Sequence, residues 1–177
     1  QITGELSEQD RDDLAKRAAK MAVLVKNPER IRAVVNHMVT HFQSKVEPNG
    51  FKAQVVAPSR IAAVRYAEHL AAFGLNAYPI ITTSHNDGPE FKWARELPET
   101  QIVEDFKEPD GEPQVLVVVD KLITGFDAPV EQVLYLDRSI REHTLLQAIA
   151  RVNRRYSRTT NGVTTEKQHG LVVDYHG

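Results

Sequence analysis

Apolar residues in this chain occur in two patterns, short unbroken runs and positions at helical spacing. The unbroken runs predict buried strands at residues 54–57, 77–82, 114–120, 132–137 and 170–175. Pro79 lies within the second run and predicts an edge strand, because proline cannot donate to a strand ladder. Apolar positions at helical spacing predict helices over 61–73, 98–106 and 143–153. Apolar strands that alternate with helices predict an α/β fold, a parallel sheet covered by helices on both faces.

The chain before this α/β pattern reads as a helical segment. Ser7 and Asp10 form a weak capping box for a first helix, and Asn27 with Pro28 suits the start of a second that ends near Lys45. The link at 46–50, VEPNG, is punctuated by proline and glycine. We therefore expect a helical flanking segment at 1–48 and an α/β domain at 49–177.

Composition is that of an ordinary globular chain, with 41% apolar and 26% charged residues in 177 positions. The formal charge of -2 gives no overall attraction to nucleic acid, so any such contact must come from a local patch. Residues 138–158 carry six arginines against one glutamate, a local charge of +5. Residues 87–112 carry a local charge of -6, which is most simply a solvated surface.

The absence of cysteine excludes disulfides, a thiolate nucleophile and a thiolate metal site. No apolar run approaches the roughly 18 residues that span a bilayer, so we expect no membrane partner and a cytoplasmic location. The chain starts at Gln1 rather than methionine and stops just after an apolar run. We therefore expect it to be part of a longer protein.

A polar loop, ITGFDAP, follows the third predicted strand. It presents the hydroxyl of Thr124, the open backbone of Gly125 and the carboxylate of Asp127. Because ligands of parallel sheets sit beyond the carboxyl ends of the strands, we expect a ligand site there. The alternative is a tight turn in which glycine and aspartate serve only the shape of the chain.

The last predicted helix carries the second candidate group. Gln147, Arg151 and Arg154 are spaced by four and three residues, which predicts one polar face. We expect the opposite face to pack on the sheet through Leu145, Leu146, Ile149 and Val152. Arginine offers a planar, permanently charged fork suited to phosphate oxygens, although a basic solvated face is the simpler alternative.

Three stretches together resemble motifs IV, V and VI of the superfamily 2 helicases and translocases. They are QVVAPSR at 54–60, VVVDKLITGFDAP at 117–129 and LLQAIARVNR at 145–154. With YLDR at 135–138, their wording is similar to the restriction (R, or HsdR) subunit of type I restriction-modification enzymes. The resemblance covers about 51–177 and implies the second RecA-like motor domain, with the helical segment flanking or linking the two motor domains.

For the nucleotide, the resemblance implies that Arg151 and Arg154 are the motif VI arginines, one of which reaches the γ-phosphate of ATP. It implies that Gln147 orders the same interface, and that Gly125 and Asp127 help close the nucleotide cleft. Motif VI often has glycine before its first arginine, where this chain has Ala150.

For DNA, the resemblance implies that Thr124 contacts the nucleic-acid backbone and that Ser59 and Arg60 contact a phosphate.

The chain has no G-x-x-x-x-G-K-[ST] phosphate loop and no D-E-x-H-type acidic motif. ATP and Mg²⁺ are therefore expected to be held mainly by a first lobe, and the chain alone should neither hydrolyse ATP nor cut DNA. The seven histidines show no metal-ligand spacing. The implied partners are a first RecA-like lobe and a nuclease domain of the same protein, duplex DNA, and the modification and specificity subunits of an ATP-dependent type I endonuclease.

Two other readings remain open from the sequence. A stand-alone α/β module that binds a nucleotide or a protein would also lack a phosphate loop and be nearly neutral. The second lobe of another superfamily 2 DNA helicase would share the general motifs.

Overall fold

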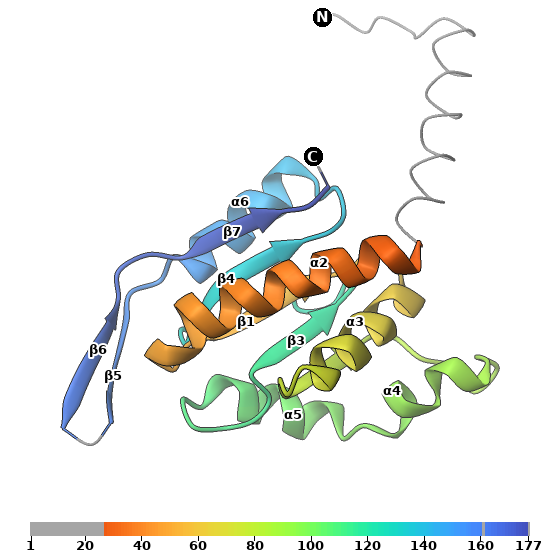
Figure 1. The fold of residues 1–177 in the computed structure, drawn as a ribbon, viewed down its shortest axis with the longest axis horizontal. Coiled ribbons are helices and arrows are strands. Elements are labelled where there is room, and N and C mark those ends of the chain that lie inside the picture. The colour runs from red at the N-terminus through yellow and green to blue at the C-terminus, as the bar shows by residue number, and fades with distance from the viewer. Residues whose placement is uncertain (1–26, 161, 177) are drawn as a thin grey trace, which may run out of the picture.

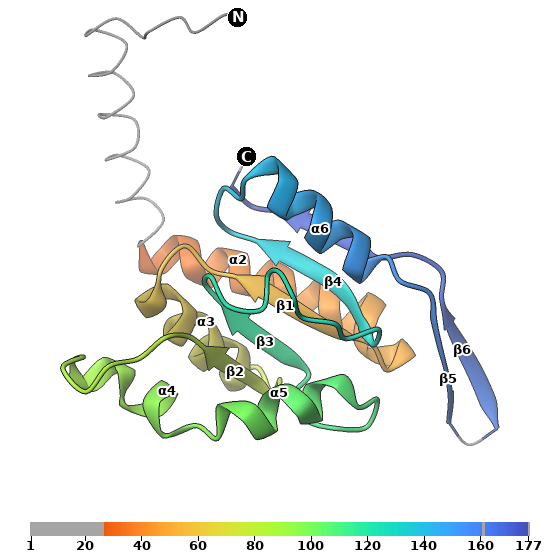
Figure 2. The same cartoon turned by 180° about the vertical axis from the view of Figure 1, so that it is seen from behind.

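A computed structural model describes residues 27–160 and 162–176, and shows a five-stranded parallel sheet with helices on both faces (Figures 1 and 2). The strand order is β2-β3-β1-β4-β7. The strands are β1 Lys52–Val56, β2 Ala77–Ile80, β3 Val115–Val118, β4 Glu131–Leu136 and β7 Leu171–Asp174. The α/β prediction is confirmed, and the first predicted helix lies outside the described residues.

Strand β2 lies at the edge of the sheet, as its proline predicted. It pairs with β3 alone, in a parallel register that sets Pro79 against Val117. An edge strand tolerates proline because one of its sides needs no ladder donor.

Helices α2 (Pro28–His41) and α3 (Arg60–Ala72) cover one face of the sheet (Figure 1). The side chain of Asn27 caps α2 by accepting from the backbone N–H of Glu29 at 2.8 Å. The helix continues as a π-helical turn, η1 (Phe42–Val46), and a 3-10 turn, η2 (Glu47–Asn49). Helix α2 and η1 share a hydrophobic core with β1 and α3. Their buried side chains in it are Ile31, Val34, Val35, Met38, Val39, Phe42 and Val46.

The described part of the predicted helical segment, 27–48, therefore shares the hydrophobic core of the α/β domain. The domain boundary at 48 stays a prediction.

Helices α5 (Glu99–Lys107) and α6 (Glu142–Val152) cover the other face (Figure 2). Their core includes Ile102 and Phe106 from α5 and Ala148 and Val152 from α6. Between β2 and α5, residues 83–97 contain a 3-10 turn, η3 (Pro89–Phe91), and a short helix, α4 (Lys92–Glu96).

The connection from β3 to β4 contains no helix. Parallel strands need a return crossover, and here residues 119–130 make it as a loop that crosses the sheet in front of β1 (Figure 2). Gln54 of β1 donates to the carbonyl of Leu122 at 3.5 Å, and Ile123, Phe126 and Ala128 are buried in the core of this face. The loop therefore begins at the carboxyl end of β3 and ends at the amino end of β4.

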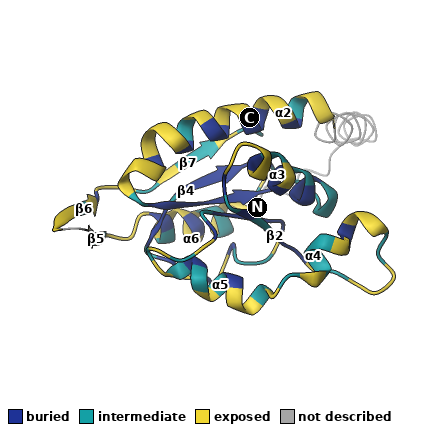
Figure 3. Ribbon diagram, turned by 60° about the horizontal axis from the view of Figure 1, so that its bottom comes forward, coloured by how far each residue is buried: buried dark blue, intermediate teal, exposed yellow. Residues whose placement is uncertain are grey.

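A two-stranded antiparallel hairpin, β5 (Tyr156–Thr160) and β6 (Val163–Lys167), separates α6 from β7. It projects from the body of the domain and is largely exposed (Figures 1 and 3). The sequence reading did not predict this hairpin. The Asn161–Gly162 dipeptide between threonine-rich stretches is the signal that could have indicated it.

A buried lysine closes the end of α5. The side chain of Lys52 is 3% exposed, and its Nζ donates to the carbonyls of Phe106 at 3.0 Å, Glu108 at 2.7 Å and Gly111 at 2.6 Å. These carbonyls lie at or beyond the helix end, where backbone acceptors have no partner within the helix. Burial lowers the pKa of Lys52 to about 8.

The depressed pKa of Lys52 predicts a pH-dependent stability difference. Between pH 8 and the ordinary lysine pKa of 10.5, the folded state binds fewer protons than the unfolded state, so stability should rise with pH. We expect the stability advantage of the wild type over Lys52→Met to grow by about 2 kcal/mol between about pH 7.5 and about pH 9.5. Urea unfolding of both proteins at the two pH values measures it, and a constant or shrinking advantage contradicts the assignment.

Candidate functional site

The end of α6 and the β3–β4 loop are joined by two arginines. Arg151 lies in the last turn of α6, and its Nη1 donates to the carbonyl of Phe126. Arg154 follows the helix, and its Nη1 forms an ion pair with the carboxylate of Asp127. The structure therefore brings together Asp127, Arg151 and Arg154, which the sequence placed in separate motifs.

This arginine cluster, defined as Arg151, Arg154 and Asp127, lies at the amino end of the strands. Asn153, which ends α6, accepts through its side-chain oxygen from the N–H of Gly170 at 3.0 Å, just before β7 begins. The expectation of a site at the carboxyl edge is wrong for these residues. Because β4 runs parallel to β3, it starts at the amino edge of the sheet. The loop therefore crosses from the carboxyl edge to the amino edge, and Asp127, near its end, lies at the amino edge.

The expected apolar face of α6 is confirmed for Val152, which is buried, and for Leu145, which packs against the core, but it is wrong for Leu146 and Ile149. Ala148 and Val152 are its buried residues, whereas Leu146 is 61% exposed and Ile149 is 36% exposed. The helix packs through its small Ala148, and Arg151, one turn further on, is partly buried on that side. Gln147 is exposed and Arg154 lies beyond the helix end, so the three polar residues do not form one face.

The ion pair between Arg154 and Asp127 is a surface contact, since each side chain is 52% exposed. The hydrogen bond from Arg154 lowers the pKa of Asp127 and raises the pKa of Arg154. Exposed pairs contribute little to stability and are screened by salt. Arg154 can therefore exchange the carboxylate of Asp127 for another anion at small cost.

Gly125 gives the loop its shape next to the cluster. Its φ is +78°, a left-handed conformation, and a Cβ there would meet nothing within 4 Å. Thr124 and Gly125 are both exposed. The glycine is needed for its backbone conformation rather than for lack of space.

Replacing Gly125 by alanine should cost about 1 kcal/mol of stability, because a residue with Cβ is strained at positive φ. Gly74 provides a matched control, since its φ is +84° and a Cβ there also meets nothing within 4 Å. We expect Gly125→Ala and Gly74→Ala to lower stability alike in urea unfolding. In a functional assay of the full-length protein, only Gly125→Ala should be impaired; equal impairment would remove Gly125 from the site.

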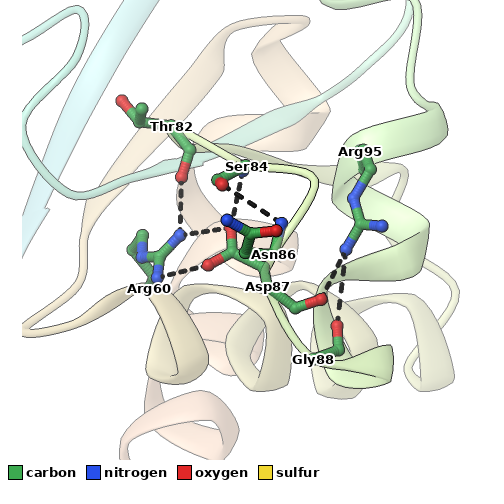
Figure 4. Close-up of polar contacts among 7 residues, drawn as sticks. All are labelled: Arg60, Thr82, Ser84, Asn86, Asp87, Gly88 and Arg95. Atoms are coloured by element: carbon green, nitrogen blue, oxygen red, sulfur yellow. Dashed lines mark hydrogen bonds and ion pairs between the residues drawn. The ribbon is translucent and has the colours of Figure 1, made fainter.

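The predicted motif IV residues lie at the carboxyl edge, away from the arginine cluster. Ser59 caps α3, its Oγ accepting from the N–H of Ala62 at 3.3 Å. Arg60 donates to the carboxylate of Asp87 at 2.7 and 2.9 Å and to the carbonyl of Thr82 at 3.0 Å (Figure 4). Both side chains therefore organise the protein itself in this structure.

The sequence reading missed the partner loop of Arg60. Asp87 also accepts from the N–H of Ser84 at 2.7 Å, while Arg95 donates to the backbone carbonyl of Asp87 at 3.0 Å (Figure 4). Hydrogen bonding from Arg60 lowers the pKa of Asp87. The turn-forming run S-H-N-D-G at 84–88 was the available signal.

Among the described residues, no group of three or more acidic or histidine side chains could hold a metal ion. Within the same part of the chain, no helix is long and apolar enough to cross a membrane.

Comparison with solved structures defines the class of fold. A fragment of a putative HsdR subunit of a type I restriction enzyme from Vibrio vulnificus matches with a TM-score of 0.55 and 16% identity, over 86% of this chain and 29% of that chain. The C-terminal domain of S. cerevisiae Dbp5 matches with a TM-score of 0.54 and 14% identity, over 86% of this chain and 72% of that domain. The Hef helicase domain of Pyrococcus furiosus matches with a TM-score of 0.53 and 17% identity, over 95% of this chain and 30% of that one. The fold is that of a RecA-like helicase domain.

Sequence comparison then identifies the family. The model for domain 3 of the type I restriction enzyme subunit R matches residues 94–177. The putative MjaVIIP endonuclease subunit of Methanocaldococcus jannaschii is 34% identical over 95% of this chain, and the HindI endonuclease subunit of Haemophilus influenzae is 34% identical over 87%. The chain is thus a relative of the R subunits of type I restriction enzymes, as its motifs predicted. It spans 17% and 15% of the length of these two relatives.

Proposed function

We propose that the chain is the second motor lobe of the ATP-dependent DNA translocase in a type I restriction enzyme R subunit. The observation that supports this proposal most is the arginine cluster. In it, two guanidiniums from the end of α6 lie together and bind the loop between β3 and β4. Similarity to R subunits favours this motor over another superfamily 2 helicase and over a stand-alone binding module.

The residues present fit one side of an ATP site. Arg151 and Arg154 supply positive charge suited to phosphate oxygens, and the open backbone at Gly125 allows close approach. Bound ATP would supply the terminal phosphoryl group, which is transferred to water in hydrolysis. The arginines would bind and orient its terminal phosphate, and Asp127 would hold Arg154 until a phosphate replaces that carboxylate. Gln147, exposed on α6, would face the same cleft.

Because the sequence contains no G-x-x-x-x-G-K-[ST] loop and no D-E-x-H-type motif, the proposal assigns the phosphate loop and the Mg²⁺ ligands to a first lobe. The chain alone should then be inactive. Its proposed partners are that lobe and a nuclease domain of the same protein, duplex DNA, and the modification and specificity subunits, in the cytoplasm.

Two of the proposed DNA contacts, Ser59 and Arg60, lie at the carboxyl edge of the sheet. The third, Thr124, is exposed on the loop that crosses the sheet, next to Gly125. Because Arg60 is paired with Asp87, its contact with a phosphate would require exchange of that ion pair. Contacts to phosphates alone bind DNA without base preference, and their affinity falls steeply as the salt concentration rises.

Translocation by the full-length R subunit, assembled with its modification and specificity subunits, tests the proposal. Displacement of a third DNA strand from a duplex reports translocation. We expect Arg154→Ala to slow displacement about tenfold or more, since a charge at the transferring phosphate would be missing. Displacement at the wild-type rate would contradict the role of this arginine.

A further inference from the structure

The β5–β6 hairpin begins just after the arginine cluster in the sequence, and its last residue contacts the loop that holds the cluster. Strand β5 starts at Tyr156, two residues after Arg154, and β6 ends at Lys167. Although most of the hairpin is exposed, the side chain of Lys167 is only 3% exposed. Its Nζ donates to the carbonyls of Pro129 at 2.6 Å and Glu131 at 2.8 Å. The hairpin is therefore anchored where the crossing loop enters β4.

The two carbonyls that Lys167 binds terminate the segment that holds the arginines. Phe126 accepts from Arg151 and Asp127 from Arg154, and Pro129 follows Asp127 by two residues. Lys167 thus fixes the exit of this segment without a contact to either arginine in the cluster.

The carboxyl group of Glu131 is buried beside Arg151. Glu131, 5% exposed at the start of β4, lines with Arg151 a small cavity of about 10 Å³. Burial raises the pKa of Glu131 to about 8, and the charges of Lys167 and Arg151 oppose that rise. At neutral pH this carboxyl group is therefore mostly protonated, and loss of the Lys167 charge would raise its pKa further. Glu131 thus places no anion beside Arg151, and Lys167 acts through the two carbonyls that it binds.

We propose that Lys167 is a positioning residue for the ATP site, holding the 126–131 segment so that the contacts of Phe126 and Asp127 keep Arg151 and Arg154 in place. This inference rests on the proposed function. It adds that the hairpin, through Lys167, helps to position the residues that would bind the nucleotide.

A second buried lysine makes the test specific. Lys52 is also 3% exposed and also donates to backbone carbonyls, but its partners lie at the end of α5. Steady-state ATPase of the full-length R subunit, assembled with its partner subunits at saturating duplex DNA, gives kcat and KM for Lys167→Met and Lys52→Met. Unfolding midpoints of the same proteins show the stability that each substitution costs.

We expect Lys167→Met to lower kcat about tenfold or more with KM within about threefold, because a small misplacement of a positioned group is costly. Lys52→Met should lower the unfolding midpoint comparably but keep kcat within about twofold.

An unchanged kcat in Lys167→Met, or an equal loss in Lys52→Met, would overturn the inference. Arg151→Ala in the same assay separates the two proposals. If Arg151→Ala abolishes turnover and Lys167→Met does not, only the positioning role fails. If neither changes turnover, the proposed ATP site fails as well.

Discussion

Arg151→Ala in the full-length R subunit is expected to lower DNA-stimulated ATP hydrolysis by about a thousandfold or more. An arginine at the transferring phosphoryl group stabilises the charge that develops there, and its loss has effects of this size. The substitution also removes the bond to the Phe126 carbonyl, a contact whose net stability contribution is about 1 kcal/mol. The chain should therefore remain folded, and steady-state ATPase with circular dichroism checks both statements.

Two further variants sharpen this test. Arg151→Lys keeps a positive charge without the planar fork and should still lose most activity. Arg155→Ala removes an exposed arginine four residues further on and should leave hydrolysis within about twofold of wild type. Undiminished hydrolysis in Arg151→Ala would contradict the assignment of motif VI.

Arg30→Met is expected to destabilise the domain by about 3 kcal/mol. Asp137, at the end of β4, is fully buried, and accepts from both Nη atoms of Arg30 and from the hydroxyl of Tyr66 at 2.5 Å. Removing the cation leaves a buried carboxylate with Tyr66 alone, and breaking a buried pair costs about 3–5 kcal/mol. The lower end applies because Arg30 is 24% exposed.

Arg32, exposed on the same helix, gives the control for that measurement. Urea unfolding should show a change within about 0.5 kcal/mol for Arg32→Met. A loss below about 1 kcal/mol for Arg30→Met would mean that α2 is held by its apolar face alone.

The sequence predicted what depends on local pattern. Every strand of the sheet was indicated by an unbroken apolar run, and Pro79 correctly identified an edge. Motif wording identified the family and named Asp127, Arg151 and Arg154, which the fold then brought together.

What the sequence did not predict depends on contacts between distant residues. Periodicity on α6 favoured Leu146 and Ile149 as core, but the packing of the 122–128 loop selected the small Ala148 instead. Nothing local to Arg60 shows that Asp87 is its partner, and Arg30 meets Asp137 across 107 residues of sequence. Contacts between residues so far apart in the sequence cannot be predicted from the local pattern around either residue.

The most direct test of the central claim is ATPase activity, with and without duplex DNA, of this chain alone and mixed with a separately expressed upstream lobe. The account predicts no hydrolysis by either part alone, and DNA-stimulated hydrolysis on mixing that is lost again with Arg151→Ala. Hydrolysis by the chain alone, or none with a correctly folded upstream lobe, would contradict a shared ATP site.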